Sequence, residues 1–214
     1  MSRLRSFAFV SVLALGGAVA AGVATERPAY ASITITVLFD ELVRDSSAAA
    51  IVTPYEQNAV WEDGRIITYT HVHADRVVAG SVEGDPWVRT MGGTVGKVGQ
   101  LVDGEAVLTM GRQGLLFLQP SKQGTSGVYA ITARAQGQFP VVLNEQNVQT
   151  FRASSGVGGL VPTPDARVAQ MAQARAKAGL AAEAPRATDV LHARPVEDAV
   201  HDVAAAWVRM HGTK

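Results

Sequence analysis

Three side chains that could bind a metal ion lie close together in the segment HVHAD. His71, His73 and Asp75 occupy alternate positions, and alternate residues of a β-strand point to the same face of a sheet. Two imidazoles and one carboxylate are suitable ligands for zinc or copper. Alternation also explains the pattern without a metal, because the residues between these three would face the core while the histidines face water. We therefore expect no metal site and no cofactor, with a zinc or copper site on this strand as the alternative.

The segment MGGTVGKVGQ, Met91–Gln100, is rich in glycine and could form a phosphate-binding loop. Such a loop lies between a strand and a helix whose first amides face the anion. The sequence from Gly99 to Gly114 is interrupted by glycines and starts a helix poorly. In addition, Lys97 is followed by valine rather than by serine or threonine. The pattern therefore predicts a tight reversal or a bulge, not a phosphate site.

Side chains that could catalyse hydrolysis are present but form no recognisable site. His192, His201 and His211 are nine and ten residues apart, which matches no ligand pattern on one helix face. The Thr-Ser-Gly and Ser-Ser-Gly segments lack the strand–turn–helix elbow that exposes a nucleophilic serine. Three pairs of neighbouring acidic residues are typical of helix caps, turns or first helical turns: Asp40-Glu41, Glu62-Asp63 and Glu197-Asp198. We expect a protein that is not an enzyme, with a hydrolase as a second alternative.

The N-terminal segment has the features of an export signal. Two arginines precede the apolar run Phe7–Leu15, which is too short to span a bilayer comfortably. Ala29 and Ala31 form the small-x-small pattern that signal peptidase needs. We expect a signal peptide at 1–31, cleaved after Ala31, and a secreted or periplasmic protein. Cleavage nearer Ala20 and an uncleaved anchor are the alternatives.

Composition excludes several kinds of partner. Cleavage after Ala31 would remove three arginines and one glutamate from a chain with 19 basic and 19 acidic residues, leaving a slightly acidic protein. This charge argues against electrostatic binding of nucleic acid. No later apolar run is long enough to insert the mature chain into a membrane. The chain has no cysteine, so its stability must come from an apolar core rather than from disulfides.

Residues 32–150 are rich in Val, Ile, Thr and aromatic residues, and they predict a β domain. Asp63-Gly64 is a strong hairpin signal between two long strands. The apolar run in Gly114–Gln119 predicts a central strand. No helix separates these strands, which favours a small closed or partly open antiparallel barrel, OB-like, over a parallel sheet. The predicted strands are 32–39, 48–61, 65–78, 86–91, 114–119, 127–135 and 137–143.

A glycine-rich linker at 151–163 precedes a helical C-terminal extension at 164–214. The first predicted helix, 164–183, has a thin apolar face. The second carries a single apolar stripe at helical spacing, formed by Val196, Ala199, Val200, Val203, Trp207 and Met210. We expect this stripe to dock on the barrel. The alternative is that Trp207, Val203 and Met210 bind a partner protein.

Several segments resemble a group of uncharacterised exported bacterial proteins. They are WEDGRIITYTHVHADRVVAGS, GDPWVRTMGGTVGKVGQLVDG, LLFLQP and AITARAQGQFPV. The resemblance covers Asp40 to Val142 and implies export, but no particular activity.

The order of strands is similar, more distantly, to the netrin-like barrel of the tissue inhibitors of metalloproteinases. Ala79-Gly80 and Leu115–Leu118 would occupy the places of that family's hairpin turn and apolar strand. The resemblance implies a similar barrel. The family inhibits through an amino-terminal cysteine that chelates the protease zinc. Ser32 would be the nearest equivalent here, so that mechanism does not transfer.

The sequence therefore predicts an exported, non-catalytic binding or accessory module. Its expected partner is another exported protein, and its expected fold is an OB-like barrel with a helical extension. Metal binding through His71, His73 and Asp75 is the first alternative to this function.

Overall fold

The computed structural model describes residues 33–123, 126–157, 159–162, 164–180 and 183–212. The predicted signal peptide and its cleavage after Ala31 lie outside these residues. Among the helices described, none has both the length and the apolar character that crossing a membrane needs.

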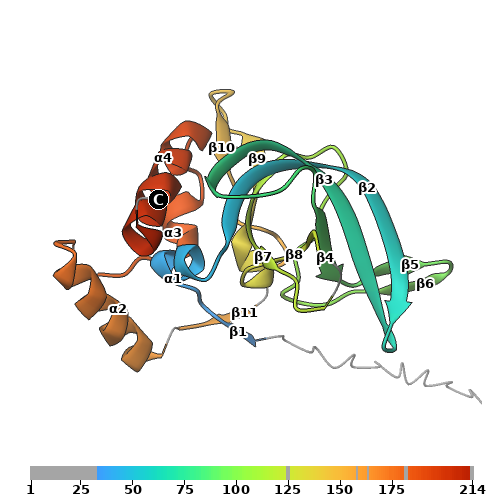
Figure 1. The fold of residues 1–214 in the computed structure, drawn as a ribbon, viewed down its shortest axis with the longest axis horizontal. Coiled ribbons are helices and arrows are strands. Elements are labelled where there is room, and N and C mark those ends of the chain that lie inside the picture. Colours follow the sequence, from blue (N-terminus) through green and yellow to red (C-terminus); the bar gives the residue numbers. More distant parts are fainter. Residues whose placement is uncertain (1–32, 124–125, 158, 163, 181–182, 213–214) are drawn as a thin grey trace, which may run out of the picture. The chain divides into compact units, whose positions relative to one another are not determined.

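Five strands close into the predicted barrel (Figure 1). Around the barrel they are β2 (Ala48–Glu62), β3 (Arg65–Gly80), β4 (Trp87–Met91), β8 (Val128–Ile131) and β7 (Gly114–Pro120), and β7 pairs again with β2. The mainly β, OB-like fold is thereby confirmed. One pairing differs from an antiparallel barrel: β4 and β8 run parallel. The long connection between them brings β8 back in the direction of β4.

Both faces of the central strands are buried, which explains their continuous apolar sequences. On β7, Leu116 and Leu118 point into the barrel, while Leu115 and Phe117 point to a second core outside it. On β2, Ala48 and Ala50 likewise face inward, and Ala49 and Ile51 face outward. The run in Gly114–Gln119 is therefore a central strand, as predicted.

Helices cover the outer core. α1 (Phe39–Arg44), α3 (Ala187–Leu191) and α4 (Val196–His211) lie together on one side of the barrel (Figure 1). β9 (Gln138–Leu143) extends the sheet from β7, and β10 (Gln149–Phe151) pairs with β9. α2 (Asp165–Lys177) buries a single side chain, that of Met171.

The apolar stripe of α4 packs within the chain. Val203 is fully buried in the outer core, and Trp207 and Met210 pack against it as partly buried residues. The Trp207 ring also stacks on His211 at 4.1 Å between centroids. Docking on the barrel is thus the observed use of the stripe. The alternative, a partner-binding surface of Trp207, Val203 and Met210, stays a prediction, in which Val203 could take no direct part because it is fully buried.

Smaller differences from the predicted elements have local causes. The strand predicted for 127–135 ends at Ile131 because Ala133 and Arg134 have positive φ angles of 56° and 54°, and the 3₁₀ turn η1 (Arg134–Gly137) follows. The predicted strand 32–39 is reduced to β1 (Ile33–Ile35), which pairs in parallel with β11 (Gly159–Val161).

The glycine-rich segment forms the predicted reversal. β5 (Gly93–Val95) and β6 (Val98–Gln100) make a short hairpin. Gly93 has φ of 126°, and a Cβ there would lie 2.2 Å from the Thr68 hydroxyl oxygen. Only glycine fits this close approach between the hairpin and β3.

We predict that Gly80→Ala destabilises the protein by more than about 2 kcal/mol. Gly80 has φ of 70°, and an added Cβ would lie 2.2 Å from the Ser47 carbonyl oxygen and 2.8 Å from the Trp207 ring. Gly84→Ala is the matched control, because Gly84 also has positive φ but nothing within 4 Å of its Cβ position. Urea unfolding of both variants measures the difference. Equal losses would show that the contact with Trp207 and Ser47 is unimportant.

Candidate functional site

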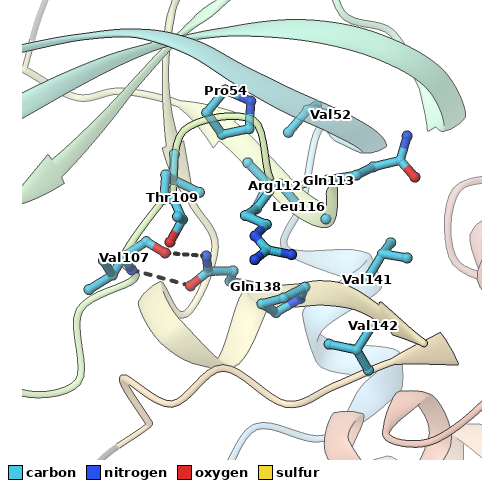
Figure 2. A pocket seen from close by; sticks show the side chains of 13 residues that line it. Val52, Pro54, Val107, Thr109, Arg112, Gln113, Leu116, Gln138, Val141 and Val142 are labelled. Atoms are coloured by element: carbon cyan, nitrogen blue, oxygen red, sulfur yellow. Dashed lines mark hydrogen bonds between the residues drawn. The ribbon is translucent and has the colours of Figure 1, made fainter. Parts of the chain in front are cut away.

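A pocket of about 340 Å³ opens at one mouth of the barrel (Figure 2). Its walls come from β2, β7, β9 and the segment that joins β6 to β7. Val52 and Leu116 belong to the inner core of the barrel, so the pocket reaches that core. The lining residues are Val52, Pro54, Val107, Leu108, Thr109, Arg112, Gln113, Gly114, Leu116, Gln138, Pro140, Val141 and Val142. The mouth of a β-barrel is a common place for a ligand site.

The segment 101–113 lies across this mouth and is fixed by a few hydrogen bonds. Gln138 of β9 donates to the Val107 carbonyl at 2.6 Å and accepts from the Val107 amide at 3.2 Å. The Ser154 hydroxyl also donates to the Gln138 side-chain oxygen, at 2.8 Å. Figure 2 shows Gln138 between β9 and the segment. These bonds engage the side chain of Gln138, one of the polar side chains that line the pocket.

Arg112 provides the positive charge of the pocket. Figure 2 shows its guanidinium extending from the segment 101–113 towards β9. In the part of the chain that the structure describes, no hydrogen bond or ion pair engages this guanidinium. The neighbouring Gln113 instead donates to Asp75 at 3.1 Å, and Asp75 also accepts from Thr53 at 2.6 Å. The hydrogen-bond partners of Asp75 are therefore Thr53 and Gln113 rather than Arg112.

His71, His73 and Asp75 share the outer face of β3, as predicted, but they do not converge. His71 Nε2 donates to the Asp85 carbonyl oxygen at 3.0 Å. Its Nδ1 lies 2.8 Å from the Tyr55 hydroxyl oxygen and 3.3 Å from a Glu56 carboxylate oxygen. His73 Nδ1 lies 3.0 Å from an Asp85 carboxylate oxygen, and its Nε2 lies 4.0 Å from Asp75.

This arrangement does not favour the metal alternative. Both ring nitrogens of His71 are used in bonds to protein groups, and its ring is stacked on Trp87 at 4.3 Å. Among the described residues, no group of three or more His, Cys, Asp or Glu side chains is placed to hold a metal ion. The three residues instead bridge β2, β3 and the loop before β4.

A polar cluster lies on the same sheet face and escaped the sequence analysis. Arg89 donates to Glu62 at 2.9 Å, and the Tyr69 hydroxyl donates to the same carboxylate at 2.5 Å. These two hydrogen bonds, first that of Tyr69 and then that of Arg89, lower the pKa of Glu62. The cross-strand pairing of Tyr69 with Arg89 places them together. These contacts join β2, β3 and β4 on this sheet face, and the charges of Glu62 and Arg89 neutralise each other.

The other histidines and acidic residues considered in the sequence analysis make local contacts that stabilise the fold. His192 Nδ1 accepts from the Ala153 amide at 3.1 Å, and His211 lies 3.1 Å from the Val43 carbonyl oxygen. Glu197 and Asp198 lie in the first turn of α4, as predicted. The sequence predicts Asp40 and Glu41 as cap or first-turn residues. Both are in fact buried, at 1% and 3% exposure, and form ion pairs with arginines of α2.

Glu105, within the segment 101–113 but outside the pocket lining, provides a pH-dependent prediction. Burial raises the pKa of Glu105 despite the positive charge of Arg134, which lies 3.7 Å away. A raised pKa means that the folded state prefers the protonated form, so stability is lost as pH rises through this pKa. Glu105→Gln is therefore expected to stabilise the protein at neutral pH and to have little effect below the ordinary pKa of 4.5. Urea unfolding at about pH 3.5 and about pH 7.5 tests this sign. A variant less stable than the parent at the higher pH would contradict it.

Comparison of the chain with protein-family models, curated proteins and solved structures gives no match. The pocket and its residues are thus the basis for functional inference.

Proposed function

We propose that this chain is an exported, non-catalytic binding module that recognises a segment of another exported protein in the pocket at the barrel mouth. The observation that carries the proposal is the pocket itself. It is about 340 Å³ in volume and reaches the inner core between β2 and β7. Export is proposed from the N-terminal segment described above.

The lining of the pocket supports binding rather than catalysis. Among the described residues that line it, there is no histidine, carboxylate, serine or cysteine. A hydrolase needs a nucleophile and a base within hydrogen-bond reach of each other. The polar groups present are the side chains of Thr109, Arg112, Gln113 and Gln138. Such a set can orient a bound group but cannot take up a proton near neutral pH.

The pocket lining combines apolar and polar groups, and recognition sites use polar groups among apolar side chains to orient what they bind. The α4 stripe packs mainly within the chain, with Trp207 and Met210 partly buried, so we assign the partner-binding role to the pocket instead. A partner segment would place an apolar side chain against Val52, Leu116 and Val142 and displace water from them, which is favourable.

Site-specific crosslinking tests this proposal. A photo-reactive diazirine side chain is placed at Thr109, on the pocket rim, and in a second protein at Val98, which is 51% exposed on β6. Both proteins are expressed in the cells that naturally export the chain, and crosslinked adducts are identified by mass spectrometry. We expect one dominant protein adduct from position 109 and not from position 98.

A pocket-filling variant is the control for this experiment. Val142→Trp narrows the pocket from its β9 wall, and its melting temperature shows whether the fold is retained. The adduct from position 109 should be lost in this background. Equal adducts from both positions, or an adduct that survives Val142→Trp, would contradict the proposal.

A further inference from the structure

We infer that the group bound in the pocket is the carboxyl terminus of a polypeptide with an apolar last residue. Its carboxylate would pair with Arg112. This inference rests on the proposed function and specifies the chemistry that the pocket recognises.

The first argument is the state of Arg112. Arg76, Arg89 and Arg194 each lie within 2.9 Å of a carboxylate oxygen of this chain. Arg112 is exposed and, like the exposed Arg65 and Arg152, its guanidinium has no partner among the described residues. It differs from those two in lining this pocket. A guanidinium binds a carboxylate through two parallel hydrogen bonds, which gives such a site direction as well as affinity.

The second argument is the rest of the lining. Apart from Arg112, the pocket has no cationic residue among those described. One positive charge suits a carboxylate with a single negative charge better than a phosphate with a charge near two. The Gln138 oxygen already accepts from Val107 and Ser154. The Gln138 oxygen is therefore occupied, and among the described lining residues Arg112 alone can pair with a negative charge.

The third argument is size. At about 340 Å³, the pocket is at the small end of the range of ligand sites. It suits the final residue or two of a chain, in which a carboxylate and an apolar side chain leave the same carbon atom. In a glutamate or aspartate within a chain, the carboxylate ends the side chain, and no separate apolar side chain leaves the carbon atom that carries it.

Peptide binding tests the inference. The probes are fluorescein-labelled octapeptides ending in Leu, Val, Phe or Lys, each made as the free acid and as the amide. We expect the acids that end in an apolar residue to bind the protein. Amidation should weaken this binding at least tenfold, and so should Arg112→Gln, since each removes one partner of the ion pair.

Arg65→Gln is the matched control, because Arg65 is exposed on β3 and lies outside the pocket lining. It should leave the affinities unchanged. Equal binding of acids and amides would overturn the role of the carboxylate, and so would an equal loss in Arg65→Gln. Free 4-methylpentanoic acid is used as a competitor. If it displaces the peptides at concentrations equal to theirs, the occupant is a small acid and not a polypeptide end.

The two proposals can fail separately. One outcome is that position 109 crosslinks to a partner, that Val142→Trp abolishes the adduct, and that no peptide acid binds. In that case the carboxyl-terminal inference is wrong and the binding function stands. If neither the crosslink nor peptide binding is found, the proposed function is wrong as well.

Discussion

Phe117→Ala is expected to lower the free energy of unfolding by about 3–5 kcal/mol. Phe117 is fully buried on the outer face of β7. Its ring meets that of Phe139 edge to face at 6.3 Å between centroids. The core around it includes side chains of α1, α3 and α4, so the cavity left by alanine would weaken the contact between the barrel and its helices.

Urea unfolding with Trp61→Ala as the control measures this effect. Trp61 is also a large aromatic residue, but it is 52% exposed near the tip of the β2–β3 hairpin. Its replacement should change stability by about 0.5 kcal/mol or less. A loss below about 1 kcal/mol for Phe117→Ala would contradict the view that one packed core joins the helices to the barrel.

Arg175→Met is expected to destabilise the protein by about 3–5 kcal/mol, because it leaves a buried charge without its main partner. Arg175 of α2 donates to Asp40 at 2.5 Å, and the Asp40 side chain is 1% exposed. Arg209 of α4 lies farther from Asp40, at 3.5 Å. Arg167 of α2 pairs with Glu41 at 2.9 Å, so α2 is held mainly through two buried carboxylates of α1.

The double variant Asp40→Asn with Arg175→Met separates the charge from the packing. Removing both charges should recover much of the lost stability, because no buried carboxylate is then left without its main partner. Arg152→Met is the control for loss of an exposed arginine. Limited proteolysis within 164–180 would show whether α2 is released. A single variant as stable as Arg152→Met would contradict the importance of this ion pair.

Much of the barrel could be predicted from local sequence. Alternation, the Asp63-Gly64 turn and the continuous apolar run of β7 depend on near neighbours in the chain, and they identified β2, β3 and β7. The parallel pairing of β4 with β8 could not be read in this way. This pairing depends on how the long segment between Met91 and Val128 brings the chain back beside β4.

The positions of charged residues were harder to predict. Asp40 has the sequence context of a helix cap, yet it is buried by Arg175, which is 135 residues away. Likewise, alternation placed His71 on the correct face but could not show that Tyr55 and Asp85 occupy its two nitrogens.

The pocket left no sequence signal because its walls come from separate segments. Val52, Arg112 and Val142 are brought together only when β2, β7 and β9 pair. One local sign was the polar segment around Arg112, between the apolar residues 106–108 and the apolar strand β7. A single arginine in such a segment is ordinarily a solvated surface residue. Arg112 can be assigned to a pocket only once the fold is known.

Mapping of a bound peptide on the protein tests the central claim most directly. ¹⁵N-labelled protein that begins at Ser32 is titrated with the octapeptide acid that binds best, and the backbone amide resonances are followed by NMR. Binding at the barrel mouth predicts shifts concentrated in 107–114 and 138–142, which Val142→Trp abolishes. OB-like barrels also bind ligands on the face of their second and third strands, here β3 and β4. Shifts concentrated in 67–71 and 87–91, with the pocket amides unchanged, would contradict the account.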